Sequence, residues 1–405
     1  MIPALPFRFL VNRRHGTPGT VVLPESGFRR AKEEIASWSG YAPTPLLDLP
    51  DAAQAARVGT VRYKDEAGRF GLGSFKALGG AYAVARLLVA ELAKRGVASA
   101  ATSAELAEGK YKEATGRITV TCATDGNHGR SVAWGAQRFG CRCVIFVHEH
   151  VSQGRRDAIA RYGAEVREVK GTYDDSVREA QRTAEREGWF VVSDTSYAGY
   201  TEVPRDVMQG YRLMADEAAE QFAPAVPTHV FVQGGVGGVA AAVSAQMRAR
   251  FGDKVKVVVV EPEKAACLLE SAEAGEPVAV HGDLDTLMAG LACGEPSLLA
   301  WQELERGAYA FMAVPDEAAV ACMKALAART PPVVAGESAV AGLAALLLAA
   351  REPIARTALD LQPDSRVLLF GTEGATDPEV YERLVGRRPE AVAAASGSGA
   401  GASSG

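Results

Sequence analysis

Short hydrophobic runs alternate with amphipathic runs through most of this 405-residue chain, and this alternation constrains the fold more than any other feature. The hydrophobic runs are rich in Val and Ile, whereas the runs between them carry apolar residues at three- and four-residue spacing. The pattern predicts strands at 116–123, 141–148, 164–171 and 189–193, and then at 228–233, 255–261 and 366–371. Such alternation predicts an α/β fold, with parallel sheets covered by helices.

The two series of strands predict two α/β domains. We expect the smaller domain as an insertion at about 84–202, and the larger one to combine 1–83 with 203–390. A chain of this length has enough core for both. Residues 391–405 are small and polar, with no core residue after Val392, and are expected to be disordered.

Charge and hydropathy exclude several classes of partner. The net charge of −5 argues against a nucleic-acid partner, because phosphate binding requires a basic face. The N-terminal residues lack the charged start and apolar core of a signal peptide. The apolar run at 339–350 is too short to span a membrane and predicts a core helix. We therefore expect a cytoplasmic protein.

The six cysteines contain no CxxC motif, and His148 and His150 form an HxH without an evident third ligand. We therefore expect no metal. Reduced, buried thiols are the expected state of the cysteines, and Cys267 and Cys293 can pair only if the fold brings them together.

Lys76 lies in a segment with glycines on both sides, RFGLGSFKALGGAY at 69–82. One interpretation is an ordinary solvated lysine near a helix start. The other is a lysine in an apolar pocket, where burial disfavours the charged form and the amine becomes a nucleophile. This segment alone does not decide between them.

The sequence QGGVGG at 233–238 joins a predicted strand to a predicted helix. Backbone amides at such a helix start bind phosphate, which is the favoured interpretation. Two others stay open. The glycines could serve packing alone, or Gly235, Gly237 and Ala240 could belong to a dinucleotide fingerprint with Glu261 as the ribose-binding acid.

A second strand–loop–helix junction, TDGNHG at 124–129, predicts another anion site, for a carboxylate held by loop amides. Asp125 is unexpected in such a loop unless a cation also binds there. The alternative is that Asp125 caps the helix. His128 has a similar alternative, as a first-turn residue that pairs locally.

Asp194 follows a predicted strand, so we expect it at the strand's carboxyl end, where ligand sites of α/β proteins form. The polar and aromatic residues after it, among them Tyr197 and Tyr200, are typical of a substrate wall. An aspartate in an Asx-turn is the alternative.

The chain resembles the tryptophan synthase β-like family, which is fold type II of the pyridoxal phosphate enzymes. Four features carry this resemblance: the lysine, the GNHG loop, the glycine loop and a C-terminal Gly-Thr segment. The resemblance covers about 40–385 and includes the early T-P-L element in YAPTPL at 41–46. Within the family, the segments at 64–83, 124–136, 193–211, 288–297 and 336–343 look like the diaminopropionate ammonia-lyases. The serine and threonine dehydratases, which are the alternative, usually have a small or hydroxyl residue where Asp125 stands.

The resemblance implies two open twisted sheets flanked by helices, a homodimer, and a cytoplasmic lyase that uses pyridoxal 5′-phosphate. It implies that Lys76 forms a Schiff base with the cofactor, with the glycines and Phe75 around it letting the planar ring lie close to the backbone. The reaction implied is α,β-elimination of ammonia from D- or L-2,3-diaminopropionate, giving pyruvate and two ammonia. The expected catalytic residues are Lys76, Asp125 and Asp194. The residues expected to bind the cofactor, besides Lys76, are Asn127, Gly234, Gly235, Val236, Gly237, Gly238 and Thr372. The residues expected to bind the substrate are Thr124, Asp125, Gly126, His128 and Tyr197.

Overall fold

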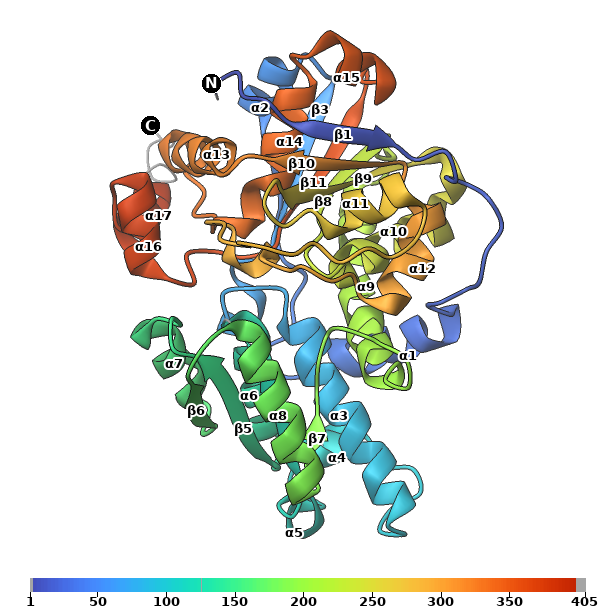
Figure 1. The fold of residues 1–405 in the computed structure, drawn as a ribbon, viewed down its shortest axis with the longest axis vertical. Coiled ribbons are helices and arrows are strands. Elements are labelled where there is room, and N and C mark those ends of the chain that lie inside the picture. The colour runs from blue at the N-terminus through green and yellow to red at the C-terminus, as the bar shows by residue number, and fades with distance from the viewer. Residues whose placement is uncertain (1–2, 125, 398–405) are drawn as a thin grey trace, which may run out of the picture. The chain divides into compact units, whose positions relative to one another are not determined.

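The computed structural model describes residues 3–124 and 126–397. The chain forms two compact units, whose elements are labelled in Figure 1. Unit 1 comprises Met1–Val21, Thr44–Ser74 and Ala215–Gly405, and unit 2 comprises Val22–Pro43 and Phe75–Met214. Each unit has its own sheet.

Within the described residues, unit 1 is built on a seven-stranded sheet of order β1-β10-β9-β8-β11-β3-β2. The neighbours from β10 to β3 are parallel, and β1 and β2 lie antiparallel at the two edges. The strands are β1 (Arg8–Val11), β2 (Leu46–Asp48), β3 (Thr60–Asp65), β8 (His229–Gln233), β9 (Lys256–Pro262), β10 (Ala310–Val314) and β11 (Arg366–Gly371).

Helices cover both faces of this sheet. Every residue of β8 and β10 is buried, and since successive side chains point to opposite faces, both faces must be covered. The predicted core helix at 339–350 is α14, in which every residue is buried. The helices of unit 1 are α2 (Pro50–Ala56), α10 (Gly238–Phe251), α11 (Cys267–Ala274), α12 (Leu298–Gly307), α13 (Asp316–Ala328), α14 (Ala341–Ala349), α15 (Pro353–Ala358), α16 (Pro378–Val385) and α17 (Pro389–Gly397), with short 3₁₀ turns η1 (Arg69–Gly71), η2 (Gly252–Lys254), η3 (Ala289–Leu291) and η4 (Ser338–Val340).

Unit 2 contains a smaller sheet in which β6, β5, β4 and β7 lie in that order and all pairs are parallel. The predicted α/β class with two sheets is therefore confirmed. The strands are β4 (Thr119–Ala123), β5 (Arg142–His148), β6 (Glu165–Val169) and β7 (Phe190–Val191); the helices are α1 (Glu25–Ala36), α3 (Ala77–Lys94), α4 (Ser103–Ala107), α5 (Lys112–Thr115), α6 (Asn127–Phe139), α7 (Gln153–Ala160) and α8 (Tyr173–Glu187). The first part of α9 (Glu202–Phe222) belongs to unit 2 and the last part to unit 1.

Unit 2 is larger than the domain expected at 84–202, because helices outside the strand–helix series join it. The whole of α3 belongs to unit 2 and packs on α6, which covers the small sheet. The segment Val22–Pro43, with α1, also belongs to it. Strand–helix alternation locates the strands, but it does not show which sheet a flanking helix covers.

The end of the described chain is a helix where we expected disorder from residue 391. α17 begins at Pro389, a favoured first helical residue, and continues through an alanine-rich run of high helix propensity. Val392 is fully buried in the core of unit 1. Residues 398–405 lie outside the described part of the chain.

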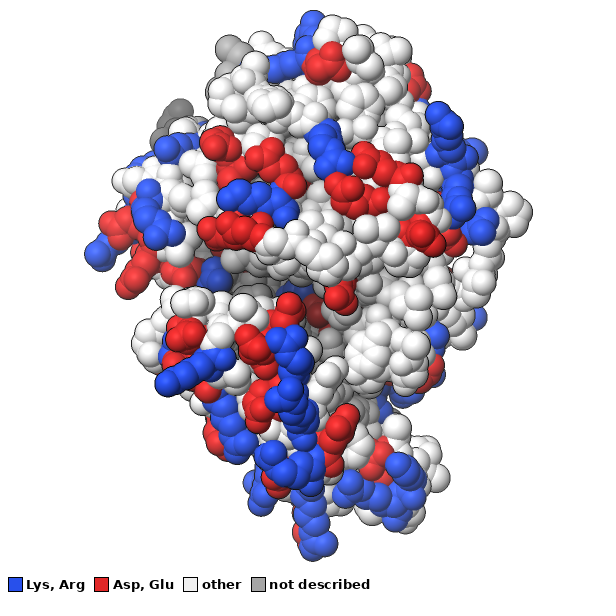
Figure 2. Space-filling view, in the orientation of Figure 1, with Lys and Arg blue, Asp and Glu red and all other residues white. Residues whose placement is uncertain are grey.

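No helix among the described residues is long and apolar enough to cross a membrane. On the face shown in Figure 2, acidic and basic side chains lie next to each other. Exposed ion pairs among the described residues include Arg178 with Asp175 and Arg8 with Glu270. Pairs of this kind contribute little to stability.

Candidate active site

The ammonium group of Lys76 is held by a carboxylate and two aromatic rings of unit 2. Lys76 is the N-cap residue of α3, and its Nζ donates to Oδ2 of Asp194 over 2.6 Å. The ring centroids of Phe75 and Tyr211 lie 5.3 and 5.7 Å from Nζ, within the range of a cation–π contact. The side chains of Lys76 and Asp194 are 21% and 17% exposed, so a ligand can reach them. Lys76 is therefore no ordinary surface lysine.

Asp194 follows β7, at the carboxyl end of the small sheet where its sequence position predicted it. Burial opposes ionisation of this carboxyl, but the charge of the Lys76 ammonium group and its hydrogen bond outweigh burial and hold the pKa of Asp194 below its ordinary value. Asp194 is therefore a carboxylate at neutral pH, and its negative charge favours the protonated form of the Lys76 amine.

His128 lies beside this ion pair. Its Nε2 is 2.8 Å from the carbonyl oxygen of Val192, which can only accept, so Nε2 carries the proton. Its Nδ1 lies 3.7 Å from Oδ2 of Asp194. Burial is the main cause that lowers the pKa of His128, so the ring is neutral at pH 7. The ring thus tethers α6 to the segment that carries Asp194.

Thr124 caps the start of α6. Its buried Oγ1 accepts the backbone N–H groups of Gly126 and Gly129 over 3.0 and 3.1 Å. The amide of Gly126, which we expected to bind an anion, is thus used within the loop. Gly126 itself has φ +155°, a conformation that favours glycine. Asn127 is the first residue of α6, and Asp125 lies outside the described residues.

Among the predicted site residues that the structure describes, Tyr197 is the most exposed, with 44% of its surface accessible. Its ring stacks on Tyr200 at a centroid distance of 5.1 Å, and its hydroxyl accepts from Nε2 of Gln181. The hydroxyl of Tyr200 donates to the carbonyl of Val191 and accepts the N–H of Ser193. Tyr200 thereby fixes the backbone that leads into Asp194, a role that its sequence position alone does not show.

The glycines after Lys76 serve helix packing, which corrects our expectation that they let a cofactor approach the backbone. A Cβ on Gly79 would lie 2.3 Å from the ring of Tyr211, and one on Gly80 would lie 2.3 Å from Oγ of Ser131. Ser131 Oγ also donates to the carbonyl of Lys76 over 2.7 Å. Small residues therefore bring α6 and α9 against the first turn of α3.

The packing of these helices extends beyond the glycines after Lys76. A Cβ on Gly135 of α6 would lie 2.7 Å from Cα of Ala81, and one on Gly210 of α9 would lie 1.8 Å from the carbonyl oxygen of Leu78. Both contacts involve the backbone of α3, which cannot move aside like a side chain. Tyr211 and Ser131 are neighbours of Lys76 that sequence reasoning missed.

In unit 1, the predicted phosphate loop joins the end of β8 to the start of α10. Gly235 and Gly237 adopt left-handed φ angles of +59° and +99°, which only glycine adopts readily. The loop is closed by bonds from the N–H of Gly234 to Val260 and from the N–H of Gly237 to Gly234. The N–H of Ser297 donates to the carbonyl of Val236.

The amides of this loop suit an anion. The N–H groups of Gly235, Val236 and Gly238 have no acceptor among the described residues. They lie at the amino end of a 14-residue helix, whose dipole favours negative charge. The geometry fits a phosphate better than the alternative of a packing turn.

The structure argues against the dinucleotide interpretation of this loop. Glu261 is fully buried, and its two side-chain oxygens accept the N–H groups of Leu268 and Leu269, each over 2.9 Å. Burial raises the pKa of Glu261 to about 8. An acid that caps α11 in this way is not placed to bind a ribose hydroxyl.

Thr372 is buried and directly follows β11, in a segment that pairs with the chain leading to Lys76. The N–H of Glu66 donates to the carbonyl of Gly371, and the N–H of Gly374 donates to that of Gly73. Ser74 and Glu373 form an isolated β-bridge. The segment that contains Thr372 is thus hydrogen-bonded to the loop that precedes Lys76. This loop ends at Ser74, two residues before Lys76.

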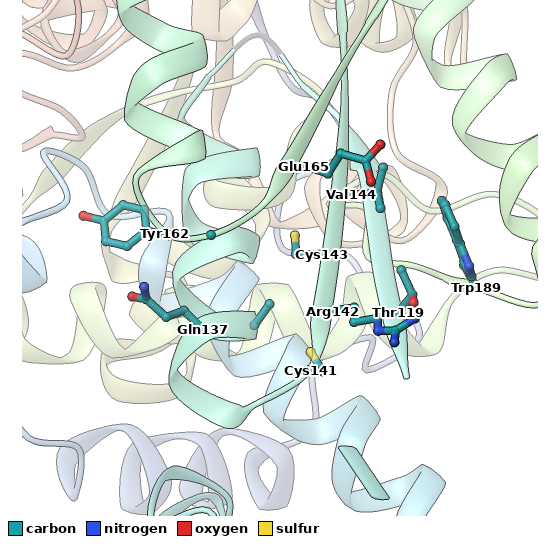
Figure 3. Close-up of a pocket in the computed structure, with 11 residues that line it drawn as sticks. Thr119, Gln137, Cys141, Arg142, Cys143, Val144, Tyr162, Glu165 and Trp189 are labelled. Carbon is teal, nitrogen blue, oxygen red and sulfur yellow. The ribbon is translucent and has the colours of Figure 1, made fainter. Parts of the chain in front are cut away.

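Other candidate features of unit 2 lie apart from Lys76 and Asp194. The cavity in Figure 3, of about 510 Å³, is lined by residues at the amino ends of β4, β5 and β6, such as Thr119, Arg142 and Glu165, whereas Asp194 lies at the carboxyl end of the same sheet. No group of three His, Cys, Asp or Glu side chains suited to a metal is found in the described residues. None of the six cysteines is part of a disulfide in the described structure.

The comparisons with known proteins agree with this geometry. The family model described as "Pyridoxal-phosphate dependent enzyme" matches residues 37–373. The diaminopropionate ammonia-lyase of Escherichia coli (strain K12) is 40% identical over 382 residues, which cover 92% of this chain and 94% of that protein. The chain belongs to the pyridoxal-phosphate dependent enzyme family, in its diaminopropionate ammonia-lyase branch.

Solved structures give the same result. The holo diaminopropionate ammonia-lyase from Escherichia coli superposes with a TM-score of 0.87 at 37% identity, covering 95% of this chain and 98% of that one. The same enzyme in complex with an aminoacrylate–pyridoxal phosphate azomethine intermediate gives a TM-score of 0.85 at 36% identity, with the same coverage. The resemblance inferred from the motifs is thus confirmed, and pyridoxal 5′-phosphate is the cofactor of the family.

The residues present fit this cofactor on two independent observations. Pyridoxal 5′-phosphate needs a lysine for its aldehyde, and Lys76 presents its Nζ where a ligand can reach it. It also needs donors for its phosphate, and the amides of Gly235, Val236 and Gly238 have no acceptor within the described chain.

The phosphate loop can be tested by substitution of Gly235 by alanine. A Cβ there would lie 3.5 Å from its nearest neighbour, so there is space for it, but the left-handed backbone costs about 1 kcal/mol. We expect the Kd for pyridoxal 5′-phosphate to rise at least about tenfold, because the methyl group and the altered backbone hinder amide contacts with phosphate. A titration followed by absorbance measures this.

The matched control is Gly386→Ala, because Gly386 also has a left-handed φ, +81°, in unit 1 but lies at the end of α16. It should lose similar stability in a thermal melt and keep the wild-type Kd. Equal Kd values for the two variants would show that the loop between β8 and α10 is only a packing turn.

Proposed function

We propose that this protein is a lyase that eliminates ammonia from 2,3-diaminopropionate, with pyridoxal 5′-phosphate as cofactor. The overall reaction adds one water and yields pyruvate and two molecules of ammonia. The observation that carries the proposal is the ion pair of Lys76 and Asp194, in a chain 40% identical to a diaminopropionate ammonia-lyase over nearly its whole length.

The cofactor would be held at four points. Lys76 would bind it covalently through Nζ, Gly234–Gly238 would bind its phosphate, Asn127 its phenolic oxygen, and Thr372 its ring nitrogen. When bound, pyridoxal 5′-phosphate supplies an electron sink for the α-carbon of an amino acid.

Lys76 would also act as a base. Once its amine is free and neutral, Nζ can take the α-proton of the substrate and become an ammonium group. Asp194, 2.6 Å from Nζ, would hold that ammonium group in place through a charge-assisted hydrogen bond. Because the pKa of Asp194 is held below its ordinary value, this carboxylate is available throughout the neutral range.

Asp125 would give the enzyme its preference for a substrate with a β-amine. A β-amine leaves readily only when it is protonated, and a nearby carboxylate favours that form. Two unit charges about 4 Å apart attract by roughly 4 kcal/mol at an effective dielectric of 20. Serine offers no such charge, so its binding would leave Asp125 without a partner.

The two isomers require two bases, because their α-protons lie on different faces. We propose Lys76 for the L-isomer and Asp125 for the D-isomer. Thr124, Gly126, His128 and Tyr197 would line the substrate site. Of these, Thr124 can still donate its hydroxyl proton, because the bonds from the two backbone amides use only the lone pairs of its oxygen.

One assay tests the proposed function. Purified holoprotein is given D- and L-2,3-diaminopropionate, L-serine and L-threonine, and the release of pyruvate or 2-oxobutyrate is measured. We expect at least one diaminopropionate isomer to have the highest kcat/KM. A higher value for serine or threonine would instead identify a dehydratase of the same fold.

We further propose a cytoplasmic homodimer. The six free thiols suit a reducing compartment, where disulfides are rare. The dimer is supported by the family resemblance, and sedimentation equilibrium of the holoprotein would measure it; a mass near 42.5 kDa, that of one chain, would contradict it.

A further inference from the structure

A buried cluster of charged residues in unit 1 lies directly before Lys76 in the chain. The guanidinium group of Arg69 binds both oxygens of Glu66, each over 2.8 Å, and both oxygens of Glu217, over 2.9 and 2.7 Å. The ammonium group of Lys64 donates to Glu217 over 2.7 Å, to the carbonyl of Thr44 over 2.7 Å and to Gln221 over 2.8 Å.

The cluster is balanced and almost completely shielded from water. Its two cations and two anions have side chains that are at most 3% exposed. The hydroxyl of Thr44 completes it, by donating to Glu66 over 2.5 Å and accepting from Arg69 over 3.2 Å. A buried pair of this kind adds little net stability, but loss of one partner is costly, since it leaves an unpaired buried charge.

The cluster joins three separate parts of the chain. Thr44 precedes β2, Lys64 and Glu66 lie at the end of β3 and just beyond it, and Glu217 lies in α9. Hydrophobic side chains would bury this junction equally well. The fork of Arg69, however, fixes both glutamates at once in a defined geometry, which is the kind of specificity that apolar contacts do not give.

The loop that follows Arg69 needs such support, because its backbone is strained. Phe70 has φ +50°, a left-handed conformation that is unfavourable for a residue with a side chain. Gly71 and Gly73 continue in left-handed conformations, with φ of +71° and +79°. Arg69 anchors one end of this loop, and the bond from Gly374 to Gly73 anchors the other.

We propose that Arg69 is a positioning residue for Lys76. Arg69 and the two glutamates that it binds hold the strained loop of residues 70–74 in one conformation. Lys76 lies two residues after this loop, so the conformation of the loop fixes the position of the Lys76 backbone. Strain kept at such a place is typical of functional sites, where the surrounding structure determines one backbone conformation. The inference rests on the proposed role of Lys76 as the lysine that binds the cofactor.

The test is Arg69→Lys, which keeps the charge and loses the fork. In the holoprotein we expect kcat for the preferred diaminopropionate isomer to fall about 10- to 100-fold with KM little changed, since displacement of a reacting group by about 1 Å costs this much. The fraction of bound pyridoxal 5′-phosphate that borohydride fixes to Lys76 should fall as well. This second measurement does not depend on turnover.

Arg212→Lys is the matched control. Arg212 is equally buried and lies on the same helix as Glu217, but its side chain bonds to Glu25 and to the carbonyls of Leu23 and Pro24. It should lose comparable stability and keep wild-type kcat and labelling, measured well below the melting temperature of each variant.

Thr44→Val is a milder second variant, which removes only the hydroxyl between Glu66 and Arg69. It should reduce kcat and labelling in the same direction, about threefold, and is expected to fold even if Arg69→Lys does not. Wild-type kcat and labelling in either folded variant would overturn the proposal. Absence of labelling at Lys76 in the wild-type protein would be a different failure, that of the proposed function.

Discussion

Replacement of Lys76 by alanine should reduce turnover of 2,3-diaminopropionate by at least about 10³-fold, because the variant lacks both the covalent attachment of the cofactor and the base for the L-isomer. Lys76 is the lysine whose Nζ donates to Asp194, so its replacement also removes this ion pair. Steady-state kinetics and the visible absorbance of the purified protein measure the two losses.

The matching measurement on the wild-type protein is borohydride reduction followed by peptide mass spectrometry. The cofactor should be found on the peptide that contains Lys76. A label on Lys64, which is fully buried and bonded to Glu217, would contradict both the assignment of Lys76 and the structural role of the buried cluster.

Asp125→Asn should have the second-largest effect. The change keeps the size of the side chain and removes its charge, so the β-ammonium group loses its partner and the D-isomer loses its proposed base. We expect kcat/KM for D-2,3-diaminopropionate to fall by about 10²- to 10⁴-fold, the range that a general base supplies. The L-isomer should lose less, because Lys76 still takes its proton.

Serine is the internal control for this variant. It has no β-charge to match, so its kcat/KM should change little, and cofactor absorbance should stay close to that of the wild type. Equal losses on D-2,3-diaminopropionate and serine would reduce Asp125 to a helix cap and favour the dehydratase interpretation. Kinetics on both diaminopropionate isomers, serine and threonine give the answer.

Much of the strand arrangement could be predicted from the sequence, because parallel strands buried on both faces are continuous apolar runs. The strand expected at 366–371 is β11 with the same bounds, the one at 228–233 begins one residue before β8, and the one at 255–261 begins and ends one residue before β9. Two interior strands of the same sheet were not predicted: β3, whose sequence TVRYKD includes three charged residues, and β10, which has only five residues. Edge strands are harder still to recognise. β2 has only three residues and β1 is partly exposed, so neither shows a distinct pattern.

Residues of the candidate site could be predicted where a reactive side chain also lies at a recognisable position in the sequence. Asp194 and Lys76 stood out through a strand end and a glycine-rich segment, and the structure brings them together. Tyr211 carries no such signal, because it is one aromatic residue in a long helix and its contact with Phe75 spans more than a hundred residues. The same is true of Arg69 and Glu217, whose pairing depends entirely on tertiary structure.

The glycines next to Lys76 were interpreted correctly as a sign of close packing but assigned to the wrong partner. A sequence shows that a position has no side chain, and it does not show what occupies the space. At Gly79 and Gly80 that space is filled by Tyr211 and Ser131.

The contact of α3 with α6 and α9 has a consequence for how such a protein can change over evolutionary time. At Gly79, Gly80, Gly135 and Gly210, even one added methyl group would meet an atom within 2.7 Å, and at two of these positions that atom is backbone. The residues of α3 and of its neighbouring helices at these contacts therefore cannot be replaced one by one with larger residues. New substrate preferences would have to arise in loops such as that around Tyr197, where side chains are exposed and can be exchanged singly.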